Sequence, residues 1–147
     1  MQSNPITQLE QLILNSNAKA FLKEIAKWAF FLSIIGFIGI GFLVILAIFS
    51  SVIFSEIPQA KLVPFDLGFA MTILFLLFAI LYFFPVYYLM QFSNKMKKAL
   101  ATKNDETLAE SFQVLKSHYK FIGVFTIISM SLYVMLIVVS IISGSLL

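Results

Sequence analysis

WAFFLSIIGFIGIGFLVILAIFSSVIF, residues 28–54, decides the fold of this chain. It runs for 27 residues without a charge, and about 20 helical residues suffice to cross a hydrocarbon core. Two further stretches, residues 67–92 and 121–142, are also uncharged. All three are continuously apolar rather than alternating, which favours helices over the strands of a membrane barrel. The sequence therefore predicts an all-α integral membrane protein with three transmembrane helices.

The composition supports the same class. Apolar residues make up 61% of the 147 residues, against roughly 45–50% in soluble domains. We therefore treat residues 1–147 as one membrane domain. The absence of cysteine excludes disulfides, thiolate metal sites and cysteine nucleophiles. All ten basic residues are lysine, whereas proteins that read nucleic acid usually rely on the arginine fork. We therefore expect no nucleic-acid partner.

The distribution of lysines predicts the orientation. The segment before the first span and the loop between the second and third spans together hold nine lysines, whereas the loop between the first and second spans holds only Lys61. Cytoplasmic loops carry the excess of lysine. We therefore expect the amino terminus and the second loop in the cytoplasm and the carboxy terminus outside, as in a multi-pass protein of an inner membrane.

Lysines next to apolar spans are candidates for contact with lipid headgroups. Lys19, Lys23 and Lys27 are spaced four apart and share one helix face, where anionic headgroups would relieve their mutual repulsion. The plainer interpretation is that these side chains snorkel to the interface. The predicted headgroup residues are Lys19, Lys23, Lys27, Lys95, Lys97, Lys98, Lys116 and Lys120.

The loop at residues 93–120 predicts a helical hairpin that extends the second and third spans into the cytoplasm. Phe92, Met96 and Leu100 continue the helical spacing of the second span. Residues 101–104 are the expected turn, and Asn104 is a favourable N-cap for the next helix. That helix has an apolar stripe of Leu108, Phe112, Leu115 and Tyr119. The stripe is either an extension of the bundle or a docking surface for a partner.

The amino-terminal segment predicts an amphipathic helix over residues 5–16. Pro5 follows Asn4, as at the start of a helix, and apolar residues then recur at helical spacing. Such a helix would lie in the interface plane or cover the hairpin. Asn15 and its neighbours interrupt it, and a second helix is expected to lead into the first span.

The spans carry features that bear on packing. Ala29, Ser33 and Gly36 form a track of small residues along the first span, with Gly39 and Gly41 nearby. Ala29, Ser33, Gly36 and Gly39 are the predicted helix-packing residues, which would let a second helix approach closely within the monomer or in a dimer. Pro85 should kink the second span, as a fixed shape or as a hinge. The polar groups within the spans are hydroxyls, at Ser33, Ser50, Thr72, Tyr82, Thr126, Ser129, Ser131 and Tyr133.

No catalytic constellation is recognisable. His118 is the only histidine. We interpret it as an interfacial side chain, with a pH-responsive role as the alternative. Glu56 and Asp66 border the short first loop, where no other polar groups converge with them. No phosphate-binding loop, metal-binding or nucleophile motif occurs. We therefore expect no enzymatic activity, no cofactor and no metal.

Three blocks of sequence resemble a family of small bacterial membrane proteins known only as a domain of unknown function. The blocks are Trp28-Ala-Phe-Phe-Leu with Ile35-Gly-Phe-Ile-Gly-Ile-Gly, Tyr82-Phe-Phe-Pro-Val-Tyr-Tyr-Leu with Phe92-Ser-Asn-Lys-Met-Lys-Lys-Ala-Leu, and the Ser-Phe-x-x-Leu-Lys-x-x-Tyr-Lys-Phe-x-Gly pattern ending at Gly123. The resemblance implies a bacterial inner-membrane protein with three spans. It implies no activity and no catalytic residues.

Two functional hypotheses follow. In the first, the protein is a non-enzymatic scaffold or accessory subunit that docks a membrane or cytoplasmic partner through the hairpin. In the second, it is a homo-oligomeric channel or permeability factor lined by the span hydroxyls. In both, the lipid bilayer is a partner of the chain.

Overall fold

The computed structural model describes residues 14–58 and 63–145. These residues form three helices: α2 (Ser16–Ser55), α3 (Leu67–Thr102) and α4 (Asp105–Ser145). Each is long and apolar enough to cross a membrane, which confirms the all-α class with three candidate spans. The amphipathic helix predicted for residues 5–16 lies almost entirely outside the described residues.

Side-chain caps determine where the first two helices begin. The side-chain oxygen of Asn15 accepts a hydrogen bond from the backbone N–H of Ala18 at 2.7 Å. Asp66 likewise accepts from the N–H of Phe69 at 3.0 Å. Each cap satisfies a backbone donor that has no partner within its helix. The new helix that Asn15 was expected to introduce is therefore confirmed.

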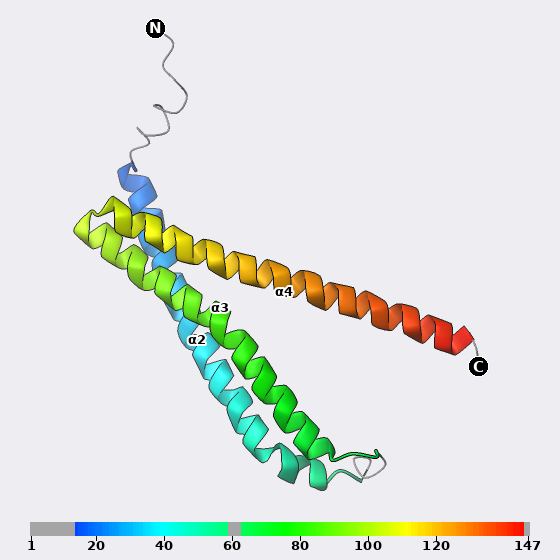
Figure 1. Cartoon of the computed structure of the whole chain (residues 1–147). Coiled ribbons are helices and arrows are strands. Elements are labelled where there is room, and N and C mark those ends of the chain that lie inside the picture. Colours follow the sequence, from blue (N-terminus) through cyan, green and yellow to red (C-terminus); the bar gives the residue numbers. More distant parts are fainter. Residues whose placement is uncertain (1–13, 59–62, 146–147) are drawn as a thin grey trace.

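Helices α2 and α3 run antiparallel and lie side by side over most of their length (Figure 1). The buried residues of α2 are spaced by three or four, or by whole multiples of a heptad, so they fall on one stripe. They are all small: Ala26, Ala29, Ser33, Ala47 and Ser50. Small side chains let two membrane helices approach closely, and this stripe is the contact surface with α3.

Three of the four predicted helix-packing residues lie at the contact between α2 and α3. Ala29 and Ser33 are buried, and a Cβ added to Gly36 would lie 2.6 Å from a methyl carbon of Val86 on α3. Gly39 does not belong to the track, because a Cβ added there would meet nothing within 4 Å. The reason is helical periodicity: the stripe continues with Ala47 and Ser50, and Gly39 is rotated away from it.

Near the connection between them, α2 and α3 are held together by a close backbone approach and by hydroxyl contacts. A Cβ added to Gly68 would lie only 2.7 Å from the Cα of Ser51. Beside it, the Ser50 hydroxyl lies within hydrogen-bonding distance of the carbonyl oxygens of Ala47 and Gly68 and of the Thr72 hydroxyl. These hydroxyls are therefore part of helix packing.

Helix α4 is arranged differently. It contacts α3 close to the connecting turn and then diverges from the α2–α3 pair (Figure 1). From Ile122 to Gly144, no residue is buried, and Phe125 alone is half-buried. The apolar carboxy-terminal part of α4, from Ile122 onward, therefore packs little against the other described helices.

Candidate functional site

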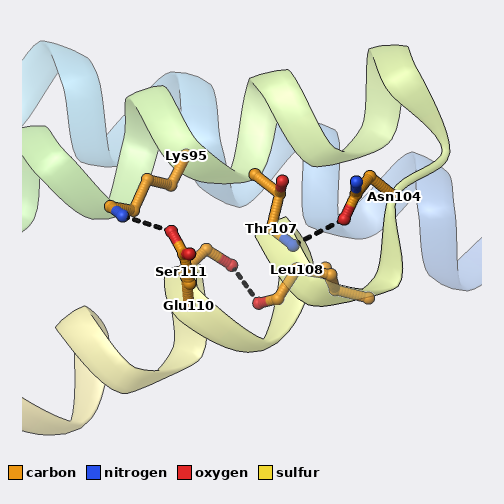
Figure 2. A network of polar contacts seen from close by, with 6 residues as sticks. All are labelled: Lys95, Asn104, Thr107, Leu108, Glu110 and Ser111. Atoms are coloured by element: carbon orange, nitrogen blue, oxygen red, sulfur yellow. Dashed lines mark hydrogen bonds and ion pairs between the residues drawn. The ribbon is translucent and has the colours of Figure 1, made fainter.

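The turn between α3 and α4 is tied together by polar contacts (Figure 2). The side-chain oxygen of Asn104 accepts a hydrogen bond from the N–H of Thr107 at 2.8 Å, which confirms its predicted role as N-cap. Across the two helices, Lys95 forms an ion pair with Glu110. The hydrogen bond and charge of Lys95 lower the pKa of the Glu110 carboxyl below its ordinary value.

The turn itself is shorter than expected. Helix α3 continues through Thr102, so residues 101–102 are helical rather than part of the predicted turn. Lys103 adopts a left-handed conformation with φ 54°, and its N–H donates to the carbonyl of Ala99. This is the usual way to end a helix, although glycine normally occupies the position. The sequence contained no glycine to signal it.

All three helices meet in one apolar cluster next to the turn. Beside this cluster, Ser111 of α4 is buried, and its hydroxyl donates a hydrogen bond to the carbonyl oxygen of Leu108 (Figure 2). Between α3 and α2, the Ser93 hydroxyl donates to the carbonyl of Ala26 at 2.6 Å. The buried members of the cluster are Ala26, Ala29, Phe92 and Met96, and those packed against them are Leu22, Leu89, Leu100, Leu108, Val114 and Leu115.

The structure divides the predicted docking stripe into two faces. Leu108 and Leu115 pack against the apolar cluster. Phe112 and Tyr119 remain 44% and 66% exposed. Each exposed residue follows an inward one by four positions, which rotates it by about 40° around the helix. The inward pair is half-buried against the cluster, whereas Phe112 and Tyr119 are the exposed members of the stripe.

The predicted headgroup lysines are also in different environments. Lys95 is engaged by Glu110, and the ammonium of Lys97 lies 4.0 Å from the centre of the Phe30 ring, a cation–π geometry. These two lysines therefore contribute to contacts between helices. The remaining six are exposed: Lys19, Lys23, Lys27, Lys98, Lys116 and Lys120.

His118 makes a contact that sequence reasoning missed. Its Nδ1 lies 2.8 Å from the carbonyl oxygen of Pro85, so the ring N–H donates to that oxygen. Pro85 lies inside α3, which runs through it as one helix. The contact joins α4 to α3 at the proline. It depends on the register between the two helices, for which the sequence carries no local signal.

Two apolar hollows flank the place where α4 leaves α3. One has a volume of about 330 Å³ and includes Pro85, Val86 and His118 in its lining. The other, of about 450 Å³, includes Tyr88, Ser117 and Lys120. Leu81, Phe121 and Phe125 line both hollows. We refer to the two hollows together as the α3–α4 wedge.

A further groove of about 490 Å³ lies between α2 and α4, over α3. Trp28 and Phe21 of α2 and Tyr119 of α4 are among its lining residues. It extends the exposed aromatic surface of Tyr119 toward the first helix.

No metal-binding cluster of three or more histidine, cysteine, aspartate or glutamate side chains occurs within residues 14–58 and 63–145. Of the two acids beside the connection between α2 and α3, Asp66 has the structural role of capping α3.

Comparison with known proteins places the chain in a family. No curated protein and no solved structure matches it. Residues 68–141 match the family of unknown function DUF5362. The match begins at the second residue of α3, ends near the end of α4, and covers just over half of the chain. The protein is therefore a member of the DUF5362 family.

Proposed function

We propose that the protein is a non-enzymatic scaffold or accessory subunit that binds a protein partner through the hairpin formed by the inner ends of α3 and α4. The exposed pair Phe112 and Tyr119 on α4 is its contact surface. In this proposal the protein resides in a bacterial inner membrane, with the amino terminus and the α3–α4 turn in the cytoplasm. The excess of lysine on that side supports the orientation.

The proposal rests on the different environments of the apolar residues along α4. Leu108 and Leu115 are used for packing, whereas Phe112 and Tyr119 stay exposed on a helix that is anchored independently of them. Aromatic residues are enriched at the energetic centres of protein interfaces. An anchored helix with two free aromatic side chains is ready to bind without first rearranging, which lowers the entropic cost of association.

The test is affinity purification from native membranes with a mild detergent. We expect one protein to co-purify stoichiometrically with the wild type and to be lost with the Phe112→Ala/Tyr119→Ala double variant. The control is Gln113→Ala, an exposed position on the same helix, which should retain the partner. Both variants should keep the thermal stability of the wild type. Retention of the partner by the double variant, or no partner with the wild type, would contradict the proposal.

A homo-oligomeric channel is the second candidate, and one observation favours it. Ser33 and Ser50 are buried against α3, so the span hydroxyls available to line a pore are mainly those of α4. Thr126, Ser129, Ser131 and Tyr133 are all exposed. This candidate predicts conductance or solute leakage when the purified protein is placed in liposomes. Liposomes that contain the purified protein but show neither conductance nor solute leakage would eliminate this candidate.

A further inference from the structure

The α3–α4 wedge lies where the predicted hairpin, with Ser117, His118 and Lys120, passes into the apolar stretches that are expected to be in the bilayer. The walls of the smaller hollow are almost entirely apolar, and Leu81, Phe121 and Phe125 are among its lining residues. Its volume of about 330 Å³ is within the roughly 300–1,000 Å³ typical of ligand pockets. An unfilled space of this size would forfeit dispersion contacts along all of its walls. An apolar occupant is therefore favoured.

The larger hollow has a polar end and an apolar end. Tyr88, Ser117 and Lys120 line it on the side of the turn, whereas Val124 and Ile128 line it farther along α4. The Ser117 hydroxyl donates to the carbonyl of Gln113, which leaves the Lys120 ammonium and the Tyr88 hydroxyl as donors. A molecule that fits needs an acceptor-rich head and an apolar tail.

The charges along α4 indicate which charge the head of the bound molecule should have. Its acids, Asp105, Glu106 and Glu110, lie in the first two turns, and its lysines, Lys116 and Lys120, lie nearer the wedge. The ion pair in the described part of the chain joins Lys95 to Glu110, far from Lys120 along the helix. Lys120 is exposed, and within residues 14–58 and 63–145 no carboxylate forms an ion pair with it. An anionic head is complementary to it.

We propose that the wedge binds one anionic phospholipid from the leaflet on the side of the turn. Its phosphate accepts hydrogen bonds from Lys120 and Tyr88, and one acyl chain lies between α3 and α4 against Phe125 and Ile128. The lipid fills the space that opens as α4 diverges and so supports the divergent position of α4. This site is independent of whether Phe112 and Tyr119 bind a protein.

Fluorescence quenching by brominated lipid tests the site. Trp28 is the only tryptophan, so a Trp28→Phe background has no tryptophan fluorescence of its own. Phe125→Trp then reports from the wedge, and Ile127→Trp, at a position 68% exposed, reports from the open lipid face of the same helix. The full-length variants are reconstituted in phosphatidylcholine bilayers that contain a small fraction of brominated phosphatidylglycerol or brominated phosphatidylcholine.

We expect brominated phosphatidylglycerol to associate with the Phe125→Trp site about fivefold more strongly than brominated phosphatidylcholine, the effect of one lysine near an anionic headgroup. Ile127→Trp should show no such preference. Adding Lys120→Gln should abolish the preference, whereas Lys103→Gln, at the turn, should preserve it. Circular dichroism verifies that each variant remains helical.

Three results would overturn the proposal. The first is equal quenching of Phe125→Trp by the two lipids. The second is a preference that survives Lys120→Gln. The third is protection of Phe125→Trp from both lipids, which would mean that a second copy of the chain fills the wedge instead.

Discussion

Gly68 should be the position least tolerant of a single added methyl group. A Cβ there would lie 2.7 Å from the Cα of Ser51, and the atom it meets belongs to the backbone. Backbone cannot rotate away as a side chain can, so the ends of α2 and α3 must separate by several tenths of an ångström. That movement also weakens the contact between the Ser50 hydroxyl and the Gly68 carbonyl.

The expected magnitude follows from two opposing terms. Overpacking a tight contact costs about 1–3 kcal/mol. Replacing glycine by alanine within a helix gains up to about 1 kcal/mol, and less at the second residue of α3. We therefore expect Gly68→Ala to destabilise the α2–α3 pair by about 1–2 kcal/mol. Gly39→Ala is the matched control, because its Cβ meets nothing, and it should gain up to about 1 kcal/mol.

Thiol accessibility measures the difference cleanly because the native chain has no cysteine. Ser33→Cys places one thiol at a fully buried position between α2 and α3, and all variants carry it. Its rate of maleimide labelling is followed as denaturing detergent is added to mixed micelles. The midpoint should fall for Gly68→Ala and stay or rise for Gly39→Ala. A Gly68→Ala midpoint equal to or above that of Gly39→Ala would refute the close backbone approach.

Three further predictions concern the turn and its neighbourhood. Ser93→Ala removes the hydrogen bond to the Ala26 carbonyl and should cost about 0.6–1 kcal/mol in the same assay; no loss would mean that this bond adds nothing net. Lys103→Gly should stabilise the protein by up to about 1 kcal/mol, because glycine adopts the left-handed conformation without strain; a destabilised variant would contradict that conformation. The pKa of Glu110 is lowered in the folded protein from 4.5, so its ion pair stabilises above about pH 4.5 and the contribution is lost as the pH falls through the folded pKa. Glu110→Gln should therefore make the stability of the protein depend less on pH in that acid range. An unchanged dependence on pH would show that Lys95 and Glu110 are not paired in solution.

Features that arise from local sequence were predictable. The uncharged runs predicted the candidate spans, and Asn15 and Asn104 were identified as interruption and cap before their hydrogen bonds were known. Part of the small-residue stripe was also recognised. The stripe continues to Ala47 and Ser50 at multiples of seven residues, a spacing that is visible in the sequence. Gly39 does not fit this spacing, so the heptad pattern would have excluded it.

Features that depend on the register between helices were not predictable. The contact of His118 with the Pro85 carbonyl joins residues 33 positions apart. The split of the stripe into inward Leu115 and exposed Phe112 depends on how α4 is rotated against the apolar cluster. Both follow from a turn that ends at Lys103 in a left-handed conformation, for which this sequence provides no glycine.

The divergence of α4 has a physical reason in the size of the facing side chains. Where α2 meets α3, the buried residues of α2 are alanine and serine, and Gly36 and Gly68 mark close approaches, although the rings of Phe37 and Phe83 also lie 6.0 Å apart. Where α4 leaves α3, the facing residues include aromatic rings: those of Phe84 and Phe121 lie 5.9 Å apart, and Phe125 also lines the wedge.

Bulky rings hold two helix axes apart, whereas small residues let them touch. The packing of α4 on α3 therefore weakens beyond Phe121, and of the described residues after it only Phe125 is half-buried. The family match covers α3 and α4, the pair that includes the turn, the exposed aromatic residues and the wedge. The loosely packed pair, rather than the tight α2–α3 contact, is thus the part of the molecule to which functional tests should be directed first.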